Sequence, residues 1–191
     1  KSPHASAELK GSDAYPNIRG TVQFYQTKNG VLIAAEIGGL PYFHGVCQHP
    51  VFGFHIHDGS QCEGDLHDPF SGAMSHYNPK GCDHPFHAGD MPPLFSNHGC
   101  AFSVFLSDRF SLSEVIGKTV IIHGNPDDFI TQHQGIQERH IVLLAELFQP
   151  AVRGLIVHRF AIPLDKQSIT LHPLVTQAEC FLVLLVLQLF E

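Results

Sequence analysis

The chain has 191 residues, of which 15% are charged, and it contains 17 Gly and 13 Pro. So many turn-forming residues favour β structure over long helices, in one domain with or without an extension. The formal net charge of −7 excludes a general electrostatic attraction to nucleic acid or to anionic membranes. The longest apolar run, residues 181–190, is about half of the ~20 residues that a membrane helix needs, so no membrane span is predicted.

Short segments of β-branched and aromatic residues recur along the first two thirds of the chain, with turn signals between them. Residues 5–10, 18–25 and 31–37 are expected to form strands, and so are residues 51–57, 101–106 and 119–123. A short helical turn is expected at residues 112–115. The sequence therefore predicts an all-β fold of about eight antiparallel strands, closed as a Greek-key barrel or a flattened sandwich.

Residues 58–93 form a long stretch that is rich in Gly and Pro and lacks the periodicity of a strand or a helix. A loop of this length in a compact domain is usually functional or disordered. Because the stretch also contains several His and Asp residues, metal binding is one way to order it. We expect a long metal-binding loop here.

Histidines give the strongest chemical signal. His55 and His57 lie two residues apart on a predicted strand, so both side chains project from one face, about 7 Å apart along the chain. Alone, this pair is also compatible with an ordinary polar strand face. The loop adds three nitrogen donors and one carboxylate, a set that suits tetrahedral zinc, and a further histidine ends the apolar strand at 119–123. The candidate ligands for two adjacent metal ions are His55, His57, His76, His84, His87, Asp90 and His123.

Four sequence motifs identify a resemblance to a known family. They are GFHIH at residues 53–57, SHYNP at 75–79, HAGD at 87–90 and IGKTVIIHGNPDD at 116–128, with GLP at 39–41 in support. Together they resemble the copper/zinc superoxide dismutases, over about residues 5–132. The resemblance implies copper held by His55, His57, His76 and His123, and zinc held by His76, His84, His87 and Asp90. It also implies that Asp127 links a copper ligand to a zinc ligand.

The activity implied by this resemblance is the dismutation of superoxide to oxygen and hydrogen peroxide. Copper would alternate between two oxidation states, and His76 would be both the bridge between the metals and the catalytic proton carrier. Zinc would hold His76 and tune its basicity. Two alternatives stay open: a copper/zinc-binding module without turnover, and an inactive dismutase. A zinc hydrolase is disfavoured, because it would need an open coordination position.

The chain departs from the family pattern after Gln132. Cys62 lies close to the position of the family's first disulfide cysteine, but the closing segment that carries its partner and the active-site arginine is not found. Cys47, Cys82, Cys100 and Cys180 do not fit the partner's pattern. Arg139 and Arg153 are the nearest candidates for the arginine, and an ordinary surface role is the better interpretation of both.

A frameshift would explain this change. When HQGIQER at residues 133–139 is back-translated and read two nucleotides out of step, it permits the lost Gly-Asn-Ser-Gly, followed by a cysteine. We therefore divide the chain into a dismutase-like domain, residues 1–132, and an atypical tail, residues 133–191. The tail is expected to lack order and the closing strand to be missing; the alternative is an extension that adds strands. The nucleotide sequence tests the hypothesis.

Compartment and oligomeric state stay open. Five cysteines allow at most two internal disulfides, and no signal peptide is recognised, so cytoplasmic and processed extracytoplasmic locations are both compatible with the chain. Because the family contains monomers and dimers, a homodimer is one of two expected states.

Overall fold

Two antiparallel sheets form the body of the protein in a computed structural model that describes residues 2–43, 45, 50–64, 70–130, 143–145 and 149–150. The chain divides into two compact units, Lys1–Ala151 and Val152–Glu191, and all described residues belong to the first. The expected boundary after Gln132 remains a prediction, because residues 131–142 lie outside the described part. No helix among the described residues has the length and apolar character to cross a membrane.

The larger sheet is built on a meander of β1 (Ala5–Gly11), β2 (Arg19–Thr27) and β3 (Gly30–Gly38), and β6 (Ala101–Ser107) pairs with β3. Buried and more exposed residues alternate along β1 and β3, which is the pattern of strands with one face on the core. Gly30 begins β3 at φ 135°, a backbone conformation that favours glycine. These strands confirm the expected all-β fold, and their ends lie within two residues of the predicted ends.

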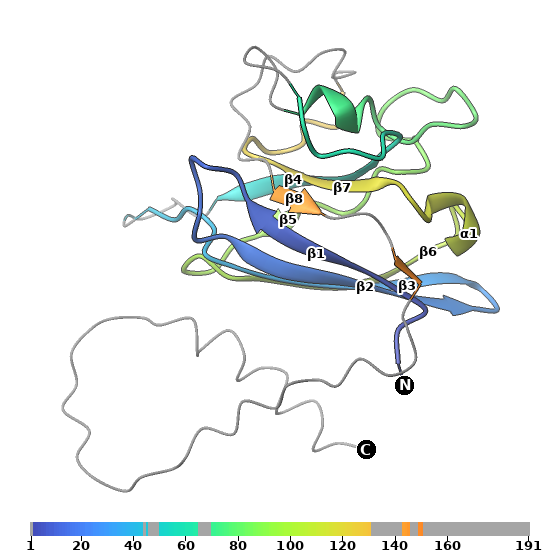
Figure 1. The fold of residues 1–191 in the computed structure, drawn as a ribbon, viewed down its shortest axis with the longest axis horizontal. Coiled ribbons are helices and arrows are strands. Elements are labelled where there is room, and N and C mark those ends of the chain that lie inside the picture. The colour runs from blue at the N-terminus through green and yellow to red at the C-terminus, as the bar shows by residue number, and fades with distance from the viewer. Residues whose placement is uncertain are drawn as a thin grey trace, which may run out of the picture. The chain divides into compact units, whose positions relative to one another are not determined.

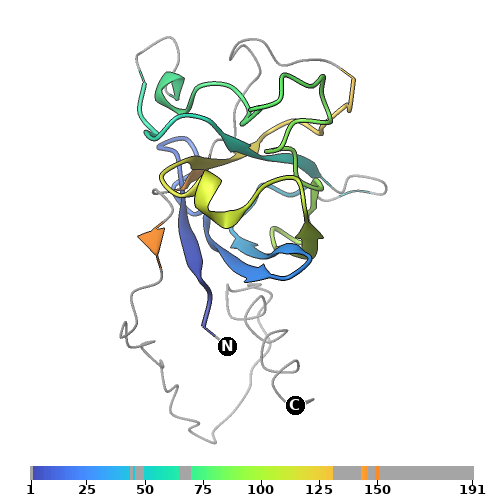
Figure 2. The same cartoon turned by 90° about the vertical axis from the view of Figure 1, so that its right-hand side faces the viewer.

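The smaller sheet consists of β5 (Leu94–Phe95), β4 (Val51–His57) and β7 (Thr119–His123). It lies across the core from β1, β2 and β3 (Figures 1 and 2). The core between the sheets is filled by large apolar side chains, including Phe24, Ile33, Phe52, Phe54, Ile56 and Ile122. The chain between β4 and β5, which contains the short helix η1 (Ser71–Ala73), lies on the outer side of the smaller sheet (Figures 1 and 2).

A four-residue helix, α1 (Leu112–Val115), precedes β7 at the predicted position. The Glu114 carboxylate explains why so short a helix forms: it accepts from the backbone N–H of Ser111 at 2.6 Å, as in a capping box, and the backbone N–H of Glu114 donates to the Ser111 carbonyl at 3.1 Å.

Two further strands, β8 (Leu143–Ala145) and β9 (Gln149–Pro150), pair with the outer edge of β1. At these positions the structure differs from the expectation that the closing strand is missing. Backbone N–H and C=O groups on an open strand edge accept a partner without requiring a particular side-chain motif, so the lost sequence pattern did not predict this pairing.

Candidate metal centre

The strand β4 positions two of the candidate ligands, because it is buried on both faces. Phe52, Phe54 and Ile56 point into the core, so the alternating residues His55 and His57 face the loop side. His123 joins this outer face from β7, where the antiparallel register sets it opposite Gly53. A side chain at Gly53 would contact both His123 and His55 at 3.3 Å, so the glycine leaves room for the rings.

Backbone hydrogen bonds attach the long loop to the edge of β4. The Tyr77 N–H donates to the Ile56 carbonyl at 2.8 Å, and the Ile56 N–H donates to the Gly89 carbonyl at 2.9 Å. The Gly89 N–H in turn donates to the Tyr77 carbonyl at 2.8 Å. As a result, His76 pairs with His57 and Asp90 pairs with His55 along the strand edge, although the loop has little regular structure.

Two groups of four side chains converge on the outer face of β4. In each group the potential ligand atoms lie within 4.8 Å of one another, and His76 belongs to both groups. The first group contains His55, His57, His76 and His123, and the second contains His76, His84, His87 and Asp90. All seven are buried except His123, which is half-buried. The structure therefore brings together every ligand that the sequence predicted.

In the second group, three Nδ1 atoms surround one carboxylate. Asp90 oxygens lie 2.8 Å from Nδ1 of His76, 3.0 Å from Nδ1 of His84 and 3.2 Å from Nδ1 of His87. The Nδ1 atoms of His76 and His87 are 3.3 Å apart. Three imidazole nitrogens and a carboxylate oxygen are the donor set that tetrahedral zinc prefers.

The first group offers imidazole nitrogens only. Nδ1 of His57 donates to the Met74 carbonyl at 2.8 Å, so Nε2 of the neutral ring carries a lone pair, and this atom lies 3.1 Å from Nε2 of His123. Nδ1 of His55 is buried and has no hydrogen-bond partner among the described residues. Because a buried acceptor without a partner costs free energy, this atom indicates a position for a cation, and imidazole suits copper.

Asp127 joins the two groups from outside. Its carboxylate accepts from Nε2 of His55 at 2.7 Å and, with the other oxygen, from Nε2 of His84 at 2.7 Å. Each ring then turns its Nδ1 lone pair toward the metal positions. This is the link that the sequence predicted for Asp127.

Comparisons with known proteins agree with this geometry. The family model described as copper/zinc superoxide dismutase (SODC) matches residues 18–143, which is more than half of the chain. The chain belongs to the copper/zinc superoxide dismutase family. "Superoxide dismutase [Cu-Zn] 2" of Aquifex aeolicus (strain VF5) is 29% identical over 146 residues, which are 69% of this chain and 79% of that protein. The enzyme of Photobacterium leiognathi, "Superoxide dismutase [Cu-Zn]", is 34% identical over 122 residues, 57% of this chain and 66% of that protein.

Among solved structures, "Cu/Zn superoxide dismutase from Brucella abortus" has a TM-score of 0.61 and 18% identity, and the match covers 75% of this chain and 98% of that one. This likeness shows the fold: a Greek-key β-barrel. Members of the copper/zinc superoxide dismutase family use copper and zinc, and the two side-chain groups fit these ions in number and type of donor.

The pKa shifts of four groups of the site, His55, His87, Asp90 and Asp127, favour the neutral imidazole and the ionised carboxylate. Burial lowers the pKa of His55 to about 4, even though its hydrogen bond to Asp127 acts in the opposite direction. Burial also lowers the pKa of His87. Burial by itself would raise the pKa of Asp90, but the hydrogen bond from His76 and the neighbouring imidazoles lower it to about 2. For Asp127, hydrogen bonds from His55 and His84 likewise outweigh burial and hold the pKa below its usual range.

Other predictions concern residues around the site. The Cys62 side chain is half-buried, and its predicted disulfide stays a prediction. Cys100, which matched no pattern, is disulfide-bonded. Arg139 and Arg153 also lie outside the described residues, so no arginine near the metal groups is assigned from them.

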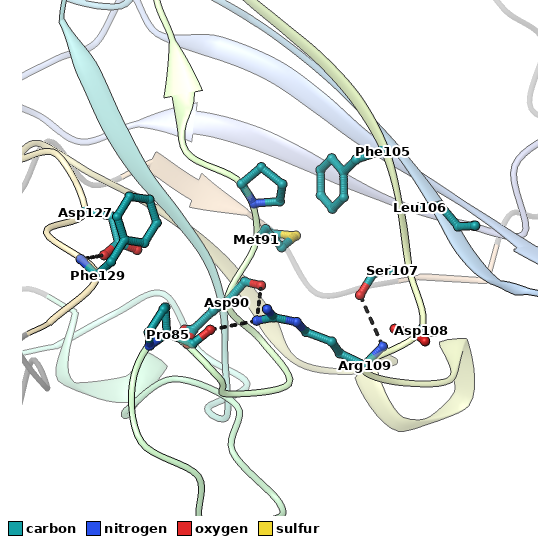
Figure 3. A pocket seen from close by; sticks show the side chains of 11 residues that line it. Pro85, Asp90, Met91, Phe105, Leu106, Ser107, Asp108, Arg109, Asp127 and Phe129 are labelled. Atoms are coloured by element: carbon teal, nitrogen blue, oxygen red, sulfur yellow. Dashed lines mark hydrogen bonds between the residues drawn. The ribbon is translucent and has the colours of Figure 1, made fainter.

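Arg109 is a functional candidate that sequence reasoning missed. It lies beside a cavity of about 300 Å³, which is bordered by Pro85, Asp90, Asp127 and Phe129 (Figure 3). An exposed arginine just after a strand carries no signal in a single sequence, because most such residues only interact with water.

Proposed function

We propose that this chain catalyses the dismutation of superoxide: two superoxide anions and two protons give one oxygen molecule and one hydrogen peroxide molecule. The observation that carries the proposal is the position of His76. Its Nδ1 lies 2.8 Å from Asp90 in the second ligand group, while the same ring is a member of the all-imidazole group. One ring shared by two metal groups is what a bridged copper/zinc centre requires.

In this proposal, His55, His57, His76 and His123 hold copper, and His76, His84, His87 and Asp90 hold zinc. Copper held there would supply the one-electron chemistry by which one superoxide is oxidised to oxygen and the next is reduced to peroxide. Zinc has no redox role.

The protein's own groups orient the ligands and supply a proton. The Met74 carbonyl fixes the ring of His57, and Asp127 fixes the rings of His55 and His84, which selects the nitrogen that each ring offers. Nδ1 of His76 lies 2.8 Å from the Asp90 carboxylate, so Nε2 is the atom of this ring that would take up a proton and release it to the product. The loop that carries His76 is held by backbone hydrogen bonds, and this keeps the ring in place through the cycle.

The test is turnover by the loaded full-length chain. Protein loaded with copper and zinc is expected to remove superoxide faster than the same protein without metal and faster than an equal amount of the free ions. His123→Ala should abolish this activity and leave zinc bound, because His123 belongs to the first group alone. His4→Ala is the matched control, since His4 is exposed just before β1 of the larger sheet and its Nδ1 accepts from the Gln26 N–H at 3.1 Å.

One result would contradict the dismutase activity and favour a metal-binding module. In that case the protein would bind one equivalent of copper but remove superoxide no faster than the metal-free control. The oligomeric state, monomer or homodimer, is measured in the same preparation by its mass in solution.

A further inference from the structure

The guanidinium group of Arg109 contacts the backbone of the segment that carries two ligands of the second group. Nη1 donates to the carbonyl oxygens of Pro85 at 2.8 Å, Asp90 at 3.2 Å and His87 at 3.3 Å. Figure 3 shows the side chain extending across the cavity to Pro85 and Asp90. A single nitrogen atom therefore donates hydrogen bonds to three carbonyl groups that lie within a segment of six residues.

This contact joins parts of the protein that are distant in sequence. Arg109 follows β6, a strand of the larger sheet, and its own backbone N–H donates to Ser107 Oγ at 3.3 Å. The ligand segment belongs to the loop outside the smaller sheet, where the Gly89 carbonyl accepts from the Ile56 N–H of β4 and the other backbone hydrogen bonds of the segment are made within the loop. The arginine adds a second point of attachment from the other sheet.

Charge explains why an arginine suits this position. The three carbonyl oxygens point toward one region, so their dipoles repel one another unless a donor lies between them. A guanidinium cation gives hydrogen bonds that are stronger than those of a neutral donor. Arg109 is exposed, so solvent weakens these bonds, and their contribution to overall stability is expected to be small.

We propose that Arg109 is a positioning residue for the second metal group. By fixing the carbonyls of His87 and Asp90, it fixes the backbone from which the His87 ring and the Asp90 carboxylate project, and so it raises the zinc affinity of this group. Loss of Arg109 increases the freedom of two of the four ligands while the fold stays intact. The inference rests on the proposed zinc site.

The competing interpretation is that Arg109 is an ordinary surface residue. Its contacts would then affect stability slightly and metal binding not at all. A second alternative is direct repulsion between the guanidinium charge and zinc, in which case removing Arg109 would tighten zinc binding. Measured zinc affinity distinguishes these alternatives, because the positioning role alone predicts weaker binding.

The experiment measures zinc affinity by chelator competition on the full chain, and the visible absorption spectrum of cobalt(II) bound at the same group. R109A is expected to lower zinc affinity about tenfold or more, as seen when groups that orient ligands are lost, and to change the cobalt spectrum. R109K keeps the charge and a nitrogen donor, but on a shorter and more flexible side chain, so it should restore part of the affinity. R19A is the matched control, because Arg19 also donates to a carbonyl, that of Ile18 at 2.6 Å, but lies on β2.

The outcomes separate this inference from the proposed function. If wild-type protein binds neither zinc nor cobalt at this group, the proposed function fails and the role of Arg109 with it. If wild-type protein binds and R109A keeps the same affinity and spectrum, or binds more tightly, only the positioning role is overturned. Should R109A not fold, R109K decides: an affinity equal to that of the wild type overturns the proposal, and a weaker one supports it.

Discussion

The carboxylate of Asp127 lies 2.7 Å from Nε2 of His55, which leaves Nδ1 of that ring for the first ligand group. The same carboxylate reaches His84 of the second group. One side chain outside the two groups of four therefore selects the ligand nitrogen in both of them. The arrangement depends on two acceptor oxygens, because each neutral ring must donate to Asp127 in order to present a lone pair to the metal.

Asp127→Asn is expected to weaken metal binding about 10–100-fold, because an amide offers only one acceptor oxygen. The ring that faces the NH₂ end must change its tautomer and direct an N–H toward the metal position. Copper and zinc affinities, measured by chelator competition, check this. Asp128→Asn is the control, since Asp128 is the exposed neighbour. Equal affinities in the wild type and in Asp127→Asn would mean that Asp127 does not orient the rings.

Gly89→Ala is expected to displace the metal loop from β4. A methyl group at this position would lie 2.2 Å from the Ile56 carbonyl oxygen and 3.1 Å from Tyr77 backbone and side-chain atoms. Backbone atoms of a buried strand cannot move aside easily, so the loop must move, together with Asp90. The variant should bind zinc at least tenfold more weakly and melt at a lower temperature than the wild type.

Gly81→Ala is the matched glycine variant in the same loop. Its methyl group would meet nothing within 4 Å, but φ at this position is 62°, so the cost is conformational and is expected to be about 1 kcal/mol. Zinc affinity should be unchanged. If both variants bound zinc like the wild type, close packing at Gly89 would not determine the position of the loop.

These two glycines illustrate how much of the site could be predicted from sequence. The ligands were predictable because their chemistry is specific: His55 and His57 share a strand face by a simple two-residue period, and His76, His87 and Asp90 belong to recognisable motifs. The contacts of Gly89 with β4 were not predictable, because a glycine in a loop looks the same whether it packs against backbone or faces solvent. Arg109 was missed for the same reason.

The strands were predicted well where alternation was strong, as in β3 and β4. β5 was missed because two residues cannot show a period. β8 and β9 were missed because their pairing with β1 is made by the backbone, which no side-chain pattern records. The sequence therefore predicted the strands in which the character of the side chains alternates between the two faces, and the structure was needed to find the others.

Removing the metals is expected to lower the melting temperature. A ligand present at 100 times its dissociation constant stabilises a folded protein by about 2.7 kcal/mol, which corresponds to roughly 5–11 °C for a chain of this size. Calorimetry of metal-free and zinc-loaded protein measures the difference. His87→Ala should lose the gain caused by zinc and His4→Ala should keep it. A zinc-dependent gain of the same size in His87→Ala would show that zinc binds elsewhere.

Glu36→Gln is expected to stabilise the protein at neutral pH. Burial raises the pKa of Glu36 above its ordinary value of 4.5, and Oε1 is buried without a hydrogen-bond partner among the described residues. A raised pKa means that the folded state favours the protonated carboxyl, so this contribution to stability is complete below pH 4.5 and is lost as the pH rises through the folded-state pKa. Glutamine is neutral at every pH and avoids the loss.

The measurement is the melting temperature of both proteins at pH 7 and about pH 4. We expect a gain at pH 7 of no more than about 2–4 °C, equivalent to roughly 1 kcal/mol or less after solvent screening, and no gain at the lower pH. Glu8→Gln on β1 is the control, because Glu8 is exposed. A gain that is equal at both pH values would rule out ionisation of Glu36 as its cause.

In the proposed copper/zinc centre, His76 is a ligand of both metals, so the two metal positions cannot fill independently. If bound zinc changes the affinity for copper by some factor, bound copper must change the affinity for zinc by the same factor. The reason is that the free energy of the doubly loaded state does not depend on the order in which the metals bind. The shared ring thus makes the centre cooperative or anticooperative as a unit. The supply of one metal therefore sets how well the protein retains the other.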